Sequence, residues 1–322
     1  MADFLTLGEP MVVFATDDLD QSLIAATHFT KFLAGAELNV AVGISRLNHT
    51  AHYVSAVGND PFGSYILHQM QTNSIQTTNI VCDPNHWTGF YLKEKVSHGD
   101  PDTYYFRKNS AAANLSEKVI NSIDLTAIQL AHLSGIYAAL SSQSLTSLKR
   151  LITRLHKRRI PISFDPNLRP SLWQDQATMI TTTNELAKNA QLILPGINEG
   201  EILVGSTDPN EIADFYLSQS DTTQAVIVKL GPRGAYVKTK DGLNQFVSGF
   251  PVEHVVDTVG AGDGFAVGVL TGLLDHLSII KAAQLGCAIG ALAVQSAGDS
   301  TGYPTRTQLT QFLSHYEKEF TR

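Results

Sequence analysis

The chain has 322 residues, of which 43% are hydrophobic and 16% charged, a composition typical of a globular protein with a substantial core. Its 30 acidic and 23 basic residues give a formal net charge of −7, which argues against a surface that binds nucleic acid or another polyanion. The most apolar region, residues 265–298, is interrupted by Asp275, His276 and Lys281, so we expect a buried pair of helices there and no membrane span.

Two further features indicate a compartment. The N-terminal segment carries Asp3 and Glu9 and lacks the basic, apolar and small-residue order of a secretory signal. The two cysteines, Cys82 and Cys287, are too few for a disulfide framework or a zinc site. We therefore expect a cytoplasmic protein.

In the first half of the sequence, apolar periodicity predicts strands alternating with helices. The predicted elements are a strand, a turn at Gly8 and a second strand over residues 4–14, a turn and helix over 34–47, a strand over 52–57, and a helix over 61–71 opened by Asp60. Residues 88–96 and 103–107 alternate between apolar and polar, and turn-forming residues separate them at 98–102. This pattern predicts a β-hairpin that forms a small sheet outside the main one.

The second half continues the alternation. We expect strands at 130–136, 161–165, 191–194 and 224–230, a helix at 143–159, a hairpin around 240–242, and helices at 265–277, 279–297 and 305–320. Such alternation predicts an α/β fold with a doubly wound, mostly parallel sheet. We see no linker or repeat, so residues 1–322 are expected to form a single domain.

Residues 257–265 form the glycine-rich run Asp-Thr-Val-Gly-Ala-Gly-Asp-Gly-Phe. The preceding residues 252–256 are apolar and β-prone, and we expect a strand that passes through the glycines into a helix. Gly260, Gly262 and Gly264 allow a sharp turn and close approach to a ligand. Free N–H groups and the positive end of the helix dipole favour a phosphate at such a helix start.

Asp263 lies inside this predicted phosphate site. A carboxylate there is suited to take a proton from a hydroxyl that attacks phosphorus. Main-chain N–H groups of Gly260, Ala261 and Gly262 would meanwhile neutralise the transferred phosphoryl group. The alternative is an ordinary helix cap, in which Asp263 only binds first-turn N–H groups.

The run 257–265 resembles the C-terminal signature of the ribokinase-like (PfkB) sugar kinases, and the resemblance extends over about residues 7–309. Gly35 and Asn39 match the N-terminal signature, although Ala34 stands where the family usually has a second glycine. The resemblance implies an ATP-dependent carbohydrate kinase with Mg²⁺, in which Asp263 is the base. It also implies a lid over the sugar, formed by segments near 9–34 and 87–108, that pairs between subunits of a homo-oligomer.

Further segments match the nucleotide side of the family's site. The resemblance implies ATP contacts from Asn198, Lys229, Gly231, Gly234, Gly260 and Gly262, a water-mediated Mg²⁺ contact from Glu201, and a monovalent cation, K⁺ in many members, near Asp257. Taken alone, Asn198 and Glu201 would be a helix capping box, and the glycines at 231 and 234 an ordinary turn.

The substrate is suggested by two arginines. Arg107 on the predicted hairpin and Arg169 beyond a predicted strand would suit a carboxylate if they converge on one pocket. Several segments resemble family members that phosphorylate sugar acids. That resemblance implies substrate contacts from Gly35, Ala36, Asn39, Tyr91, Tyr105, Arg107, Asn167, Arg169, Asp263 and Asp299. The alternatives are a kinase for fructose or another neutral sugar, and a non-catalytic sugar-acid sensor.

Overall fold

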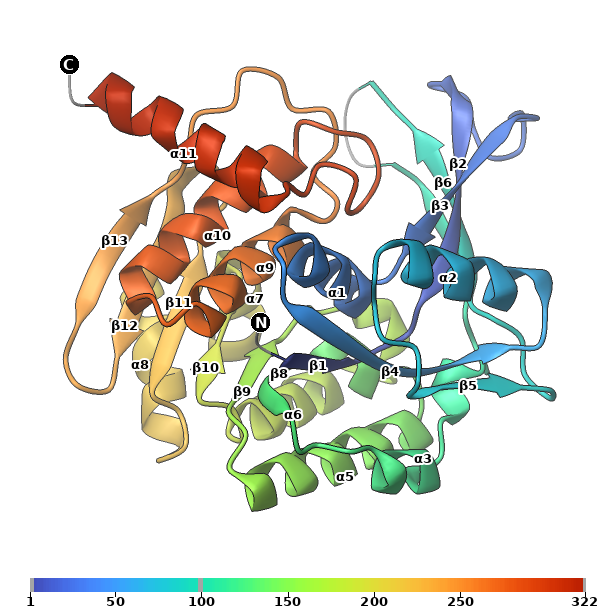
Figure 1. The fold of residues 1–322 in the computed structure, drawn as a ribbon, viewed down its shortest axis with the longest axis horizontal. Helices are drawn as coiled ribbons and strands as arrows, with labels where there is room; N and C mark the ends of the chain where they lie inside the picture. Colours follow the sequence, from blue (N-terminus) through green and yellow to red (C-terminus); the bar gives the residue numbers. More distant parts are fainter. Residues whose placement is uncertain (1–2, 98–100, 321–322) are drawn as a thin grey trace.

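Two sheets organise the protein in the computed structural model, which describes residues 3–97 and 101–320 (Figure 1). The larger sheet, as far as these residues show it, has nine strands in the order β13-β12-β11-β10-β9-β8-β1-β4-β5. They are β1 (Asp3–Leu7), β4 (Thr50–Gly58), β5 (Ile80–Asp83), β8 (Ile128–Ser134), β9 (Ile162–Asp165), β10 (Leu192–Ile193), β11 (Ala225–Lys229), β12 (Gly234–Thr239) and β13 (Asn244–Ser248).

All neighbouring strands from β11 to β5 run parallel, and β12 and β13 are antiparallel additions at one edge. Of the central strands, β11 is a nearly continuous apolar run and β8 is buried along almost its whole length, because a parallel sheet is covered by helices on both faces. The predicted α/β fold with a mostly parallel, doubly wound sheet is confirmed.

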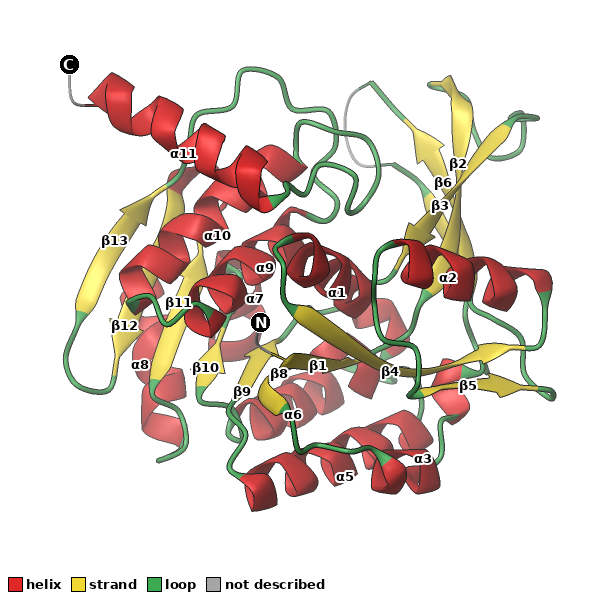
Figure 2. Ribbon diagram, in the orientation of Figure 1, coloured by secondary structure: helices red, strands yellow, loops and turns green. Residues whose placement is uncertain are grey.

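Helices cover the two faces of this sheet and form two hydrophobic clusters (Figure 2). One face carries α1 (Ala36–Arg46), α2 (Pro61–Thr72), α9 (Ala261–Leu274), α10 (Ile279–Ala293) and α11 (Arg306–Phe320). The other face carries α3 (Glu117–Ser122), α4 (Gly135–Ala138), α5 (Ser142–Arg158), α6 (Gln176–Ala187) and α8 (Pro209–Gln219). Helix α7 (Ile197–Val204) follows β10, and the short 3₁₀ helices are η1 (Ala112–Asn114), η2 (Pro170–Leu172) and η3 (Gly231–Arg233).

A second, smaller sheet projects from one end of the larger one (Figure 1). We call it the small sheet; its order is β3 (Phe29–Ala34), β2 (Met11–Leu19), β6 (Phe90–Lys95) and β7 (Thr103–Phe106). Strands β6 and β7 pair antiparallel, as their alternating sequence predicts. Part of the predicted turn between them, residues 98–100, lies outside the described residues.

The predicted strand at residues 252–256 is wrong. These residues belong to the loop that precedes α9, and the side chains of Val255 and Val256 are 60% and 58% exposed. The main-chain N–H groups of Val256 and Asp257 both donate to Val294 O, which holds the segment against the end of α10 without a strand ladder. Apolar, β-branched residues favour a strand only where a neighbouring strand can pair with them.

Other differences concern boundaries and short elements. Helix α9 begins at Ala261 and not at residue 265, and α10 ends at Ala293 and not at 297. Strand β5 and helices α3, α6 and α8 lie in segments where the sequence pattern predicted no element. Helix α6 contains three consecutive threonines, which have low helix propensity, and its start is fixed by the Asp175 side chain, which accepts from Thr178 N. None of the helices in the described parts of the protein combines the length and apolar character that a membrane crossing requires.

Helices α9 and α10 approach closely enough to require a glycine. A Cβ at Gly268 would lie well inside van der Waals contact of the backbone carbonyl group of Leu285 on α10. The backbone at this contact cannot rotate away as a side chain would. This close contact between α9 and α10, which we call the α9–α10 seam, fixes the position of α9 and therefore of its N-terminus.

We predict that Gly268→Ala lowers the free energy of unfolding by about 1–3 kcal/mol, because the added methyl forces α9 and α10 apart. The control is Gly290→Ala on α10, where the new Cβ would meet its nearest neighbour, Ala261 O, at 3.4 Å. That variant should be neutral, or more stable by up to about 1 kcal/mol, because alanine favours the helix. Chemical denaturation of both variants checks this, and equal effects would show that the seam is not tightly packed.

Candidate active site

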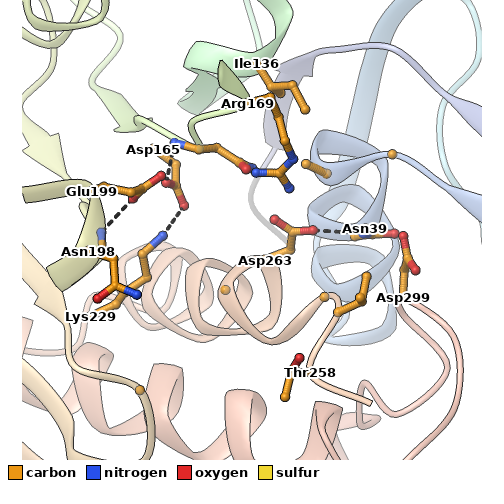
Figure 3. Close-up of a pocket in the computed structure, with 18 of the residues that line it drawn as sticks. Asn39, Ile136, Asp165, Arg169, Asn198, Glu199, Lys229, Thr258, Asp263 and Asp299 are labelled. Carbon is orange, nitrogen blue, oxygen red and sulfur yellow. Dashed lines mark hydrogen bonds and ion pairs between the residues drawn. The ribbon is translucent and has the colours of Figure 1, made fainter. Parts of the chain in front are cut away.

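A cavity of about 660 Å³ opens at the carboxyl ends of β9, β10 and β11 (Figure 3). The N-terminus of α9 forms its floor, and residues of α1 and the small sheet complete its wall. Open α/β sheets place their ligands at this edge. The cavity is the site to which the sequence motifs belong.

The main chain turns at Gly260 directly before α9. Gly260 has a φ of 80°, in the left-handed region, and a Cβ there would collide with the backbone carbonyl of Asp299. The Tyr303 hydroxyl donates to Gly260 O at 2.7 Å and fixes the turn from the other side. The first N–H groups of an α-helix have no partner inside the helix, and here they adjoin the cavity that Gly260 and Gly262 line. This loop therefore offers main-chain donors and the positive end of a helix dipole to an anion.

Asp263 lies in the first turn of α9, and its side chain faces Asn39 of α1 (Figure 3). Asn39 Nδ2 donates to Asp263 Oδ2 at 2.8 Å. Desolvation in the cavity raises the pKa of Asp263 to about 7; the Asn39 hydrogen bond acts to lower it and the charge of Asp165 to raise it further. A carboxyl group with this pKa is suited to exchange a proton near neutral pH.

A largely buried lysine lies across the cavity from Asn39. Lys229, the last residue of β11, donates from Nζ to Asp165 Oδ2 at 2.6 Å. Burial acts to lower the pKa of Lys229, but the charges of Asp165 and Glu199 outweigh it and raise the pKa. Lys229 is therefore positively charged, and it borders the cavity within reach of the glycine loop at Gly262.

The two predicted arginines differ in their partners. Arg107 is only 7% exposed and forms a buried ion pair with Glu9, with Nε to Oε2 at 2.7 Å. Arg169 donates from a terminal NH group to Leu168 O at 2.8 Å and extends toward Asp263 (Figure 3). Within the described residues, Arg169 forms no ion pair with a carboxylate. The charge of Arg107 is thus compensated inside the protein, whereas that of Arg169 is available to a ligand.

The small sheet contributes aromatic side chains. Tyr91 on β6 is 5% exposed; its hydroxyl donates to Asp299 Oδ2 at 3.4 Å, and its ring lies 5.0 Å from that of Tyr105 on β7. Burial raises the pKa of Asp299, while the charge of Lys93 acts to lower it. All the residues predicted to contact the substrate line this one cavity: Gly35, Ala36, Asn39, Tyr91, Tyr105, Arg107, Asn167, Arg169, Asp263 and Asp299.

Of the other predicted site residues, Asn198, Lys229, Gly231, Gly260 and Gly262 also line the cavity. Four do not. Ala261 is the first residue of α9, and Gly234 begins β12 with a φ of 105° and packs against β13. Glu201 is exposed on α7, and Asp257 is paired with Lys93 in the loop before Gly260.

The capping box suggested for Asn198 and Glu201 occurs earlier in the sequence than predicted. Helix α7 begins at Ile197, so Gly196 is the N-cap and Glu199 is the third helical residue. Glu199 accepts from Gly196 N at 2.7 Å and from Leu168 N at 2.8 Å. Glu199 therefore joins the start of α7 to the segment that follows β9.

Four charged residues at or beside the cavity were not among the predicted site residues: Glu9, Lys93, Asp165 and Glu199. Asp165 ends a predicted strand, so its position at the sheet edge was a usable signal. Lys93 lies two residues after Tyr91 on β6, and residues two apart on a strand point to the same side of a sheet. The ion pairs of Lys229, Arg107 and Lys93 join residues between 64 and 164 positions apart, and local sequence carries no signal for such pairs.

Comparisons with known proteins agree with this arrangement. A model described as pfkB family carbohydrate kinase matches residues 1–306. A 2-dehydro-3-deoxygluconokinase from Bacillus subtilis (strain 168) is 44% identical over 314 residues, which cover 97% of this chain and 95% of the relative.

Two solved structures are similar over nearly the whole length. The PfkB protein from Polaromonas sp. JS666 has a TM-score of 0.86 and 38% sequence identity, and covers 96% of this chain and 99% of its own. A fructokinase double mutant from Vibrio cholerae O395, in fructose, ADP and potassium ion bound form, has a TM-score of 0.84 and 27% identity, with 97% and 98% covered.

The raised pKa of Asp263 leads to a prediction about stability. Its folded-state pKa of about 7 lies above the usual value for an aspartate, so the folded protein binds this proton more tightly than the unfolded state does. Ionisation of Asp263 therefore lowers stability progressively as the pH rises from about 4 to about 7. Asp263→Asn should be more stable than the parent by about 1–3 kcal/mol above pH 7, and the gain should vanish near pH 4.

Thermal unfolding across this pH range measures the difference. Asp241→Asn, in the exposed turn between β12 and β13, is the control and should show no such pH-dependent gain. An Asp263→Asn variant that is less stable than the parent at neutral pH would show that desolvation does not dominate at this position.

Proposed function

The protein belongs to the pfkB family of carbohydrate kinases, and from this premise we propose that it phosphorylates the terminal hydroxyl of 2-keto-3-deoxygluconate (2-dehydro-3-deoxygluconate) with ATP. The enzyme is a phosphotransferase that acts on a sugar hydroxyl. The observation that carries the proposal is the placement of Asp263 between the glycine loop and Asn39, within a cavity that also holds Arg169, an arginine with no ion-pair partner among the described residues. The similarity to the Bacillus subtilis kinase supports the choice of substrate.

Asp263 is the proposed general base. Its carboxylate lies beside the free N–H groups at the start of α9, so a hydroxyl that it binds is held next to the place where a phosphoryl group would be stabilised. Asn39 donates to one carboxylate oxygen, which leaves the other free to accept the substrate proton. The main-chain N–H groups of Gly260 and Gly262 would receive the charge that develops on the transferred group, whereas the N–H of Ala261 donates to Thr258 O at 3.3 Å.

Arg169 is the proposed reader of the sugar-acid carboxylate. Its guanidinium borders the same cavity and has no carboxylate partner within the described residues, so a substrate carboxylate would complete a charge-assisted pair. Arg107 adds a positively charged side chain to the cavity wall, but Glu9 already neutralises much of its charge. A second role for Arg107 is to hold the small sheet against the segment after β1.

ATP is proposed to lie along the carboxyl ends of β10 and β11, next to Asn198, Lys229 and Gly231. The fructokinase neighbour, described with ADP, supports a nucleotide in this fold. The described residues contain no group of three or more His, Cys, Asp or Glu side chains that could hold a metal ion. Mg²⁺ keeps several waters and binds mainly to phosphates, so Asn198, which lines the cavity, is its proposed water-mediated contact, whereas Glu201 lies outside the cavity lining. When bound, the ion would neutralise phosphate charge.

Potassium fits less well. The fructokinase neighbour is described with a potassium ion, and Asp257 is the residue that we expect near such an ion. In this protein the Asp257 carboxylate already accepts from Lys93 at 2.7 Å and from Val259 N at 3.0 Å. The proposed function therefore does not include potassium.

The small sheet is proposed to act as a lid that covers the sugar and excludes water during transfer. Its residues Tyr91, Tyr105 and Arg107 line the cavity. Leu19 and Tyr104, on the same sheet, are 53% and 63% exposed, and apolar side chains at such a surface support pairing of two lids in a homo-oligomer. A cytoplasmic location is proposed as well, because ATP is the phosphate donor and both cysteines are free thiols.

We predict that Asp263→Asn lowers kcat by about 10²–10⁴ with little change in KM for the sugar acid, because the variant binds the hydroxyl but cannot take its proton. In the parent enzyme kcat/KM should rise with pH to a plateau, with an apparent pKa of about 7, since only the ionised carboxylate accepts a proton. Steady-state measurement of ADP release checks both. Unchanged turnover in Asp263→Asn, beside an equally active Asp241→Asn control, would remove Asp263 from this role.

A substrate panel separates the sugar-acid kinase from a fructokinase, which the structural similarity keeps as the second candidate. We predict a higher kcat/KM for 2-keto-3-deoxygluconate than for fructose. Arg169→Ala should reduce kcat/KM for the sugar acid about 10²-fold and leave fructose nearly unaffected, because only the acid loses a charge-assisted pair. Arg158→Ala, exposed on α5, is the control. Equal losses for both sugars would show that Arg169 does not read the carboxylate.

A further inference from the structure

One ion pair connects the small sheet to the loop that leads into α9. Lys93 Nζ on β6 donates to Asp257 Oδ2 at 2.7 Å, and the two side chains are 12% and 20% exposed. Their positions are 164 residues apart in the sequence. A pair this sheltered is screened less by salt than a surface pair.

Strand alternation brings Lys93 to this position. Residues two apart on a strand lie on the same face, so Tyr91 and Lys93 both face the body of the protein. Tyr91 contacts Asp299, and Lys93 contacts Asp257. These two aspartates belong to the two loops that meet where Gly260 packs against the main chain of residue 299.

The Asp257 side chain also shapes the loop in front of the phosphate site. Its Oδ1 accepts from Val259 N at 3.0 Å, and its own N–H donates to Val294 O at 3.3 Å. Both carboxylate oxygens are therefore committed, one to the main chain of the loop and one to the ammonium group. Gly260 follows shortly after, so the orientation of Asp257 helps to set the direction of the free N–H groups at the start of α9.

Negative charge accumulates around this loop. Asp257, Asp263 and Asp299 lie near one another, and the charge of Asp257 acts to raise the pKa of Asp299 whereas that of Lys93 acts to lower it. A phosphate would bring further negative charge to the same place. A cation beside Asp257 offsets this repulsion on the side of the loop that faces the small sheet.

We propose that Lys93 is the built-in monovalent cation of this loop and makes the enzyme independent of potassium. An ammonium group has the same charge as a potassium ion and a similar size, and it donates to the same carboxylate that such an ion would bind. Lys93 is thus a positioning residue: it touches neither reacting group but fixes the loop through Asp257. Because Lys93 belongs to the small sheet, the proposed lid itself carries the cation. The inference rests on the proposed function only in assigning phosphate to the loop.

The test compares the parent, Lys93→Met and Lys93→Arg in potassium chloride and in tetramethylammonium chloride at equal ionic strength. Thermal unfolding without substrate is the first readout, and kcat/KM with the sugar that the parent phosphorylates best is the second. The parent should be indifferent to potassium in both. In tetramethylammonium, Lys93→Met should lose about tenfold in kcat/KM, and potassium should restore most of that loss and raise the unfolding temperature, because binding to the folded state stabilises it.

Lys93→Arg keeps the charge and should remain indifferent to potassium. Lys95→Met, an exposed position on the same strand, is the matched control and should behave as the parent. A parent that requires potassium would overturn the proposal. So would a Lys93→Met variant whose loss potassium does not relieve, or one with no loss in tetramethylammonium. The thermal unfolding measurement uses no sugar. It therefore tests the role of Lys93 even if the enzyme does not phosphorylate the proposed substrate.

Discussion

The site depends on one constraint: the helix N-terminus that has to accept a phosphate also holds a carboxylate. Asp263 is favoured there by the helix dipole, yet it would repel the group that it helps to transfer. Desolvation resolves part of the conflict by raising its pKa to about 7, so that near neutral pH the side chain is close to balance between its two protonation states. The remaining structure keeps that balance by placing Asn39 and Arg169 on one side and Asp165 on the other.

The supporting charges come from distant parts of the sequence and meet only because the sheet brings its strand ends together. Lys229 ends β11, Asp165 ends β9, and Glu199 lies in the first turn of α7 after β10, so three neighbouring strands of the sheet bring together one largely buried group of charges. Buried charges of this kind are stable only when paired and hydrogen-bonded. The same logic applies to Glu9 and Arg107, which join the small sheet to the end of β1.

The sequence was sufficient for the fold class and for the glycine loop, because each depends on a local pattern, and the family resemblance supplied many of the residues that line the cavity but not Asp165 or Glu199. Gly260 shows why: a left-handed turn before an apolar helix has a recognisable sequence. Residues 252–256 show the limit, since a β-prone segment becomes a strand only if another strand lies beside it. Arg107 shows a second limit. Its residue type predicted a ligand contact, but its burial against Glu9 is a long-range pairing that no local pattern encodes.

The small sheet is made of two separate excursions of the backbone, one between β1 and α1 and one after β5. The tip of the first excursion reaches far into solvent, where Ile24 is 99% exposed, and it makes no contribution to the large sheet. Lengthening or shortening this tip leaves the register of every parallel strand unchanged. The part of the small sheet that covers the sugar can therefore change in length during evolution while the residues at the start of α9 stay in place. Substrate choice can thus evolve separately from the catalytic chemistry.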